Sequence, residues 1–154
     1  MKASDQINIL EENLKALKES VYWLKRSYQI CSGQFHIENL PEEGYDAFES
    51  LTARFARTVD ILTNKVYRSI VYLEEGTSFS WLDTLLYLEK QELLSSIDRI
   101  RMIKELRNEI VHEYTAVELK ELFSEVLNAC PELFTLIEKS INHADQLLIK
   151  LRGK

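Results

Sequence analysis

Residues 45–73 read YDAFESLTARFARTVDILTNKVYRSIVYL, and apolar side chains recur in this stretch every three or four positions. These apolar positions are Tyr45, Phe48, Leu51, Phe55, Val59, Leu62, Val66, Ile70 and Leu73. Side chains at this spacing lie on one face of an α-helix. Pro41 suits the first turn and Gly76 suits the position just past the end, so we predict a helix from Pro41 to Glu75. Thirty helical residues span about 45 Å, which predicts an elongated molecule.

A second apolar stripe comes earlier in the chain and predicts a helix from about Ser4 to Cys31. Gly33 stands just past that end, where glycine adopts a left-handed cap most easily. Beyond Gly76, the sequence Ser80–Asp83 is typical of a capping box, so we expect a brief helix to begin there.

The last part of the chain carries three further helix signals. Ser95–Asp98 is an N-terminal signal and predicts a helix from about Ile97 to Tyr114. Thr115–Glu118 is a capping box that should restart the chain in a new direction. Pro131 is expected to break that segment and to open the last helix, which ends near Leu151.

Composition agrees with a single helical domain. The chain has 154 residues, of which 45% are apolar and 29% charged, as in an ordinary globular domain. It contains only 4 Gly and 2 Pro, and this scarcity of turn residues disfavours an all-β fold. We therefore predict one all-α domain over residues 1–154, an up-and-down bundle of four principal helices with one or two short extra helices.

Charge, thiols and hydropathy limit the class of function. With 19 basic and 25 acidic residues the net charge is -6, which excludes a protein that coats nucleic acid without sequence preference. Cys31 and Cys130 form no spaced cluster, and His36 and His143 share no ligand spacing, so no metal site or cofactor is predicted. Without a signal-peptide core or a long uncharged stretch, a cytoplasmic protein with no membrane partner is expected.

One segment, Leu106–Tyr114 (LRNEIVHEY), departs from the pattern of a plain bundle. On a continuing helix, Arg107 and Tyr114 fall inside or beside the apolar stripe, whereas Asn108 and His112 share an adjacent face. A guanidinium at that position has lost part of its hydration and needs a partner. Packing explains each residue singly, since Arg107 can pair with a carboxylate of a neighbouring helix and His112 can favour the helix dipole. Together they form the pattern R-x4-H-x-Y, expected by chance about 0.007 times in this composition.

This segment resembles the signature of the HEPN superfamily (higher eukaryotes and prokaryotes nucleotide-binding domain). Its R-x4-H-x-Y form resembles the ribonuclease toxins of HEPN–nucleotidyltransferase toxin–antitoxin modules. The resemblance implies a metal-independent endoribonuclease that acts as a homodimer, with the motifs of two subunits facing across a cleft. It implies catalytic roles for Arg107 and His112 and a supporting role for Asn108. It also implies that Tyr114 receives AMP from a cognate minimal nucleotidyltransferase antitoxin.

Physical chemistry is compatible with these roles. RNA supplies its own nucleophile in the 2′-hydroxyl, so the protein needs proton transfer and charge stabilisation. His112 can accept or donate a proton near neutral pH, and Arg107 offers a fixed fork of donors to a phosphate. Asn108 could orient the imidazole or hold a phosphate oxygen. On a helical wheel Arg107 and His112 are about 140° apart, so a twofold axis that joins two copies would bring them together better than one chain does.

Two other hypotheses remain open at the level of sequence. The first is a non-catalytic HEPN module that presents a nucleotide or substrate to a nucleotidyltransferase and uses the same arginine and histidine as phosphate ligands. The second is a helical scaffold whose motif is coincidental. Local positive charge for RNA is available from Arg99, Arg101, Lys104 and Arg107, although a basic helix face is often only solvated.

Overall fold

A computed structural model describes residues 2–112 and 114–153, and that part of the chain is mostly helical, without strands. The helices are α1 (Ala3–Gln34), α2 (Glu42–Asp60), α3 (Tyr67–Glu75), α4 (Trp81–Lys90), α5 (Ile97–Glu109) and α6 (Ala116–Arg152). A 3-10 turn, η1 (Ile37–Asn39), joins α1 to α2, and a π-helical segment, η2 (Ile61–Val66), joins α2 to α3. The prediction of an all-α bundle is therefore confirmed.

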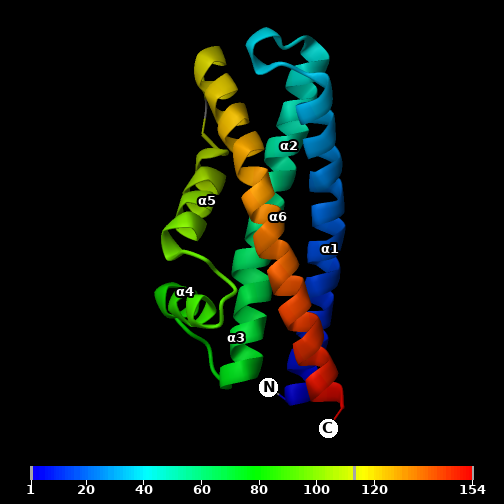
Figure 1. Cartoon of the computed structure of the whole chain (residues 1–154), viewed down its shortest axis with the longest axis vertical. Coiled ribbons are helices and arrows are strands. Elements are labelled where there is room, and N and C mark those ends of the chain that lie inside the picture. Colours follow the sequence, from blue (N-terminus) through cyan, green and yellow to red (C-terminus); the bar gives the residue numbers. More distant parts are fainter. Residues whose placement is uncertain (1, 113, 154) are drawn as a thin grey trace.

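The long helices run up and down the bundle (Figure 1). In the view of Figure 1, α1 ascends, α2 and α3 descend as one rod, α5 ascends, and α6 descends along the whole height. Both termini lie at the lower end. The shorter helices stand to one side, where α4 contacts α3 and α5, and α5 also contacts α2 and α6.

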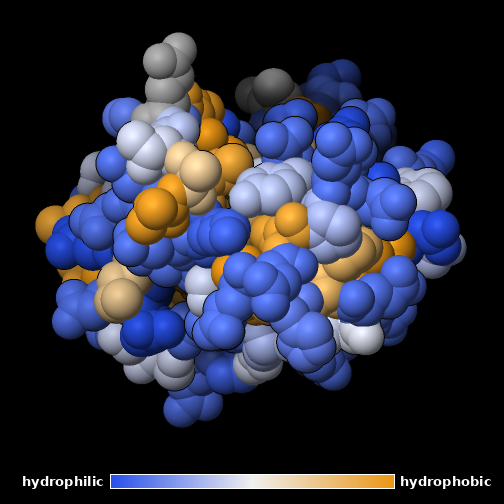
Figure 2. Space-filling model, turned by 90° about the horizontal axis from the view of Figure 1, so that it is seen from above, coloured by the Kyte–Doolittle hydropathy of each residue, from blue (hydrophilic) through white to orange (hydrophobic). Residues whose placement is uncertain are grey.

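One hydrophobic core joins α1, α2, α3 and α6. Leucines along one face of α1 are fully or nearly buried, and Phe48 of α2 stacks on Phe123 of α6 with ring centroids 5.1 Å apart. Burying each such side chain stabilises the fold by roughly 1.5–3 kcal/mol. Hydrophilic residues cover most of the end seen in Figure 2, with separate apolar patches between them.

The helix predicted from Pro41 to Glu75 is present and ends as expected. The helical path starts at Glu42, and Gly76 follows Glu75 in the left-handed conformation with φ 78°. The helix differs from the prediction in η2, where six residues form a π-helix, with backbone hydrogen bonds over five residues in place of four. A π segment rotates the side chains that follow it, and such segments are frequent at functional sites.

Two expected breaks do not occur. Pro131 lies inside α6, which continues without interruption, because the stripe Phe123, Val126, Cys130 and Leu133 stays buried on both sides of it. The packing of this stripe outweighs the roughly 3 kcal/mol by which an interior proline disfavours a helix. Gly33 also lies within a helix, since α1 extends to Gln34 and is followed by Phe35 in an extended conformation, so the predicted left-handed cap is wrong.

The helix that carries the motif ends earlier than predicted. α5 stops at Glu109 rather than Tyr114, and residues 110–112 form a tight turn. The amide of Ile110 donates to the Arg107 carbonyl and the amide of His112 to the Glu109 carbonyl, both over three residues. The wheel positions expected for His112 and Tyr114 therefore do not apply. α6 then begins with the predicted capping box at Thr115, which is confirmed.

Candidate functional site

Arg107 is the anchored residue of the motif. Its Nε donates to Asp60 Oδ1 at 2.7 Å and its Nη2 to Asp60 Oδ2 at 2.8 Å. Asp60 is the last residue of α2, so the pair ties α5 to the start of η2. The hydrogen bonds to this carboxylate raise the pKa of Arg107 above its usual value. The partner that a guanidinium beside the apolar stripe needs is thus Asp60.

Asn108 and His112 are exposed and open to a ligand. Neither side chain makes a hydrogen bond or ion pair with a residue in the described part of the chain. Asn108 projects from the last turn of α5, whereas His112 belongs to the turn beyond it. Within one chain Arg107 therefore hydrogen-bonds Asp60, and the structure does not join Arg107 to His112.

Tyr114 closes the turn that carries His112. Its hydroxyl donates to the carbonyl oxygen of Glu109 at 2.7 Å, so it links the end of α5 to the segment before α6. The surroundings are acidic, because Glu118 and Glu125 lie beside it in a small hollow of about 120 Å³. Burial first, and then the carboxylates of Glu109, Glu118 and Glu125, raise the pKa of the Tyr114 phenol.

A second polar cluster lies one helical turn before Arg107. The Lys104 ammonium donates to Thr63 Oγ1 at 3.2 Å and to Asn64 Oδ1 at 2.9 Å, both in η2. It also lies 4.6 Å from the ring centroid of Trp81, the first residue of α4. The Arg68 guanidinium stands 6.0 Å from the same ring.

The basic residues proposed from the sequence do not form one patch. Arg99 makes a bidentate pair with Glu132 of α6, at 2.9–3.1 Å, so its charge is already compensated. Lys104 and Arg107, by contrast, face α2 and η2. The positive charge beside η2 therefore comes from Lys104 and Arg107 of α5, with Arg68 of α3 near the same tryptophan ring as Lys104.

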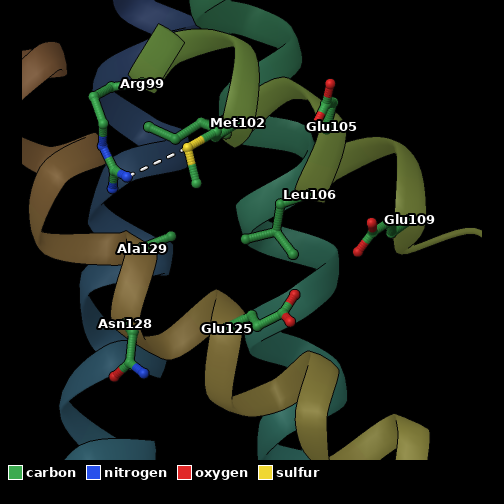
Figure 3. A pocket seen from close by; sticks show the side chains of 9 residues that line it. Arg99, Met102, Glu105, Leu106, Glu109, Glu125, Asn128 and Ala129 are labelled. Atoms are coloured by element: carbon green, nitrogen blue, oxygen red, sulfur yellow. Dashed lines mark hydrogen bonds between the residues drawn. The ribbon is translucent and has the colours of Figure 1, made fainter. Parts of the chain in front are cut away.

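The opposite side of α5 is acidic. A groove of about 420 Å³ lies between α5 and α6, and Figure 3 shows Glu105, Glu109 and Glu125 around it, with Arg99 directed at Met102. Three carboxylates there would repel a polyanion. The charges around α5 therefore favour an anionic ligand on the side that faces η2 over one in this groove.

Sequence reasoning missed Asp60, Thr63 and Asn64. They follow Val59 and surround Leu62 in an apolar stripe, where polar residues usually indicate only the solvent side of a helix. Nothing in the local sequence predicts a π turn at this point. Thr63 falls between the regular apolar positions of the sequence, and only the structure shows that it is fully buried.

Fold and site together define an all-α bundle with an Arg–His–Tyr motif at the end of a late helix. Residues 78–140 match the sequence profile of the ribonuclease HepT-like family, which is of HEPN type. The range contains α4, α5 and the whole segment Arg107–Tyr114. The resemblance to the HEPN superfamily is thus confirmed over this range. No match was found among curated proteins or among solved structures.

Proposed function

We propose that this protein is a metal-independent endoribonuclease toxin, in which Arg107 and His112 cleave RNA at the interface of a homodimer. The observation that carries the proposal is the match to a ribonuclease HepT-like family over the range that holds the R-x4-H-x-Y pattern. The geometry supports it, because Arg107 is held in a fixed position while Asn108 and His112 are exposed.

The chemistry assigned to these residues is attack by the 2′-hydroxyl of RNA on the adjacent phosphorus. His112 takes the proton of the 2′-hydroxyl as the new oxygen–phosphorus bond forms. The bond from phosphorus to the 5′-oxygen breaks, and that oxygen receives a proton from a protonated His112 imidazole. Asp60 uses two of the five guanidinium donors of Arg107, so the remaining three can donate to phosphate oxygens as negative charge develops. Asn108 is assigned to hold a phosphate oxygen beside them.

We assign a homodimer, and the positions of Arg107 and His112 support this assignment. Arg107 is turned toward α2, and His112 lies in the turn past the end of α5. A twofold axis near this turn would place the arginine of one copy beside the histidine of the other. We also assign residues 1–154 to a single domain, and a cytoplasmic location because both cysteines are free, buried thiols.

Neutralisation is assigned to AMP transfer onto Tyr114 by a nucleotidyltransferase antitoxin. The Tyr114 oxygen attacks the α-phosphorus of ATP, a new oxygen–phosphorus bond forms, and pyrophosphate leaves while the phenolic proton passes to a base of the partner. The ester cannot donate to the Glu109 carbonyl, so the turn at His112 loses its link. The added negative charge also stands among Glu118 and Glu125 and repels RNA.

Expression without a partner tests the ribonuclease. The wild type should arrest growth and cleave RNA, whereas His112→Ala and Arg107→Ala should do neither, because each lacks one catalytic group. His143→Ala is the matched control, since His143 of α6 pairs with Glu74 away from the motif. If wild type and His112→Ala are equally harmless but co-purify with a nucleotidyltransferase, the non-catalytic binding module is the correct function.

The modification is tested separately by intact mass. Incubation with the nucleotidyltransferase and ATP should raise the mass of the wild type by AMP increments and abolish cleavage. Tyr114→Phe should gain no mass, while Tyr72→Phe should behave as the wild type. An increment retained in Tyr114→Phe would assign the modification to another residue.

A further inference from the structure

The Lys104 ammonium is unusual because it is half-buried and has no acidic ion-pair partner among the described residues. Its hydrogen-bond acceptors are a hydroxyl, Thr63 Oγ1, and an amide oxygen, Asn64 Oδ1. An ammonium that loses hydration without a counterion is destabilised. Burial, followed by the charges of Arg68 and Arg107, lowers the pKa of Lys104 against the opposing effect of Asp60. The cluster thus stabilises the cation less well than water does.

The local charge balance favours an anion. The charges of Asp60, Arg68 and Arg107 all act on Lys104, and two of these three are positive. Asp60 is engaged in two hydrogen bonds by Arg107, so it compensates the charge of Lys104 only in part. This positive cluster lies on a chain whose net charge is -6. A ligand phosphate would supply the counter-charge that the protein omits.

The cluster is held in place before any ligand binds. The hydroxyl of the buried Thr63 donates to the Val59 carbonyl at 2.8 Å, so its oxygen lone pairs face the ammonium. Thr63 and Asn64 are consecutive residues of η2, and the side-chain oxygens of both accept from Lys104. An ammonium has three donors, so one N–H of Lys104 remains for a ligand.

The aromatic side of the cluster is also fixed. Trp81 begins α4, whose N-terminus is capped by the Ser80 hydroxyl accepting from the Asp83 amide at 3.1 Å. Arg68 donates to the Phe79 carbonyl at 3.4 Å, which keeps its guanidinium near the Trp81 ring. Fixed side chains lose little conformational entropy when a ligand binds.

We propose that Lys104, together with Arg68 beside Trp81, binds a backbone phosphate of single-stranded RNA next to the phosphate that is cleaved. This inference rests on the proposed ribonuclease function and adds to it the path of the strand. Lys104 precedes Arg107 by three residues on α5, so their Cβ atoms lie about 5–6 Å apart on one side of the helix. The strand runs from the motif toward η2 and α4 and avoids the acidic groove between α5 and α6.

Lys104→Gln tests the site because glutamine keeps a similar length and a donor but removes the charge. Binding of a fluorescent RNA oligonucleotide is measured by anisotropy in the His112→Ala background, so that no cleavage occurs. Lys104→Gln should raise Kd about tenfold and lower the slope of log K against log salt by about 0.7, the value for one phosphate on a single strand. Lys104→Arg should restore most of the binding. Lys139→Gln, an exposed lysine of α6, is the matched control and should bind as the parent does.

Arg68→Gln is the second variant, because Arg68 is exposed and its loss should leave the fold intact. It should weaken RNA binding in the same direction as Lys104→Gln. Titration with AMP in the same assay shows whether the site binds RNA or a free nucleotide. Equal RNA binding by Lys104→Gln, Arg68→Gln and Lys139→Gln would overturn the proposal, and so would a Lys104-dependent affinity for AMP without one for RNA.

Cleavage kinetics separate this inference from the proposed function. In a chain with an intact motif, Lys104→Gln should raise KM more than it lowers kcat, since it removes a binding contact. A wild type that binds RNA through Lys104 without cutting it would refute the ribonuclease and leave the phosphate site standing. If Lys104→Gln cuts RNA with the same KM and kcat as the wild type, the phosphate site is refuted and the ribonuclease function is not.

Discussion

At the scale of single residues, the Asp60 carboxylate orients the Arg107 guanidinium of the motif. Asp60 holds Arg107 by two short hydrogen bonds from a different helix, and both side chains keep contact with solvent. A pair of this exposure contributes about 1 kcal/mol or less to stability. Its larger effect is geometric, because it limits the rotamers of the guanidinium and leaves a defined set of donors for a phosphate.

Asp60→Asn should separate orientation from charge. Asparagine can accept only through one oxygen, so Arg107 is less well oriented, while the local charge becomes more positive. We expect kcat to fall about tenfold and RNA affinity to rise, with Tm lowered only slightly. Single-turnover cleavage and anisotropy measure the two effects. Asp46→Asn, exposed on the same helix, is the control, and an unchanged kcat in Asp60→Asn would contradict an orienting role.

At the element scale, a local break signal is overridden by packing in α6. Pro131 is exposed, so its ring fills no part of the core, and its missing N–H leaves the Leu127 carbonyl without a helical donor. The stripe on the opposite face, which includes Val126 and Cys130, is fully buried. Packing therefore fixes the path of α6, and the proline lowers the stability of that path.

Pro131→Ala should stabilise the protein. Alanine restores the hydrogen bond and favours the helix, and the greater entropy of the unfolded chain offsets part of this gain. We expect the free energy of unfolding to rise by about 1–2 kcal/mol, measured by urea denaturation. Lys139→Ala, at an exposed position of the same helix, should change it by less than about 0.5 kcal/mol. A lower stability for Pro131→Ala would show that α6 requires the proline.

At the scale of the whole molecule, burial controls both thiols. Cys31 of α1 and Cys130 of α6 lie in the single core that joins the long helices. Burial raises the pKa of Cys31 to about 11, and burial with the nearby Cys31 raises that of Cys130 to about 12. In the unfolded chain these thiols ionise near pH 9. The folded state therefore binds more protons above that pH.

This proton uptake predicts the direction of the alkaline response. The stabilisation is fully present below pH 9 and declines as the pH rises from about 9 toward 11 and 12, since only the unfolded thiols ionise there. Urea denaturation across this range should show a falling free energy of unfolding. A disulfide-exchange reagent at pH 8 should label two thiols in denaturant and almost none in the native protein. Rapid labelling of the native protein would contradict burial of both cysteines.

No helix in the described residues is long and apolar enough to span a membrane.

The two sides of α5 differ in charge. Lys104 and Arg107 face η2, whereas Glu105 and Glu109 line the groove against α6. On a chain of net charge -6, the side of α5 with Lys104 and Arg107 is the positive surface that our proposal assigns to RNA.

The sequence by itself determined where most helices begin and which of their faces are buried. Pro41, Gly76 and Thr115 act through their own backbone and nearest neighbours, so their effects can be read locally. The R-x4-H-x-Y segment was equally local, and it indicated the family that the match to residues 78–140 supports. Local rules were less reliable at Gly33, because a helix end also depends on what the next turn can pack against.

Only the tertiary structure decided the contacts that build the site. Asp60 and Arg107 are 47 positions apart, and Thr63 and Lys104 are 41 positions apart. No spacing rule relates such residues, because their distance depends on how α5 packs against α2 and η2. The π segment η2 and the end of α5 at Glu109 were likewise seen only in the structure. Apolar periodicity reports which face of a helix is buried, but the partner of each polar group is set only when the helices meet.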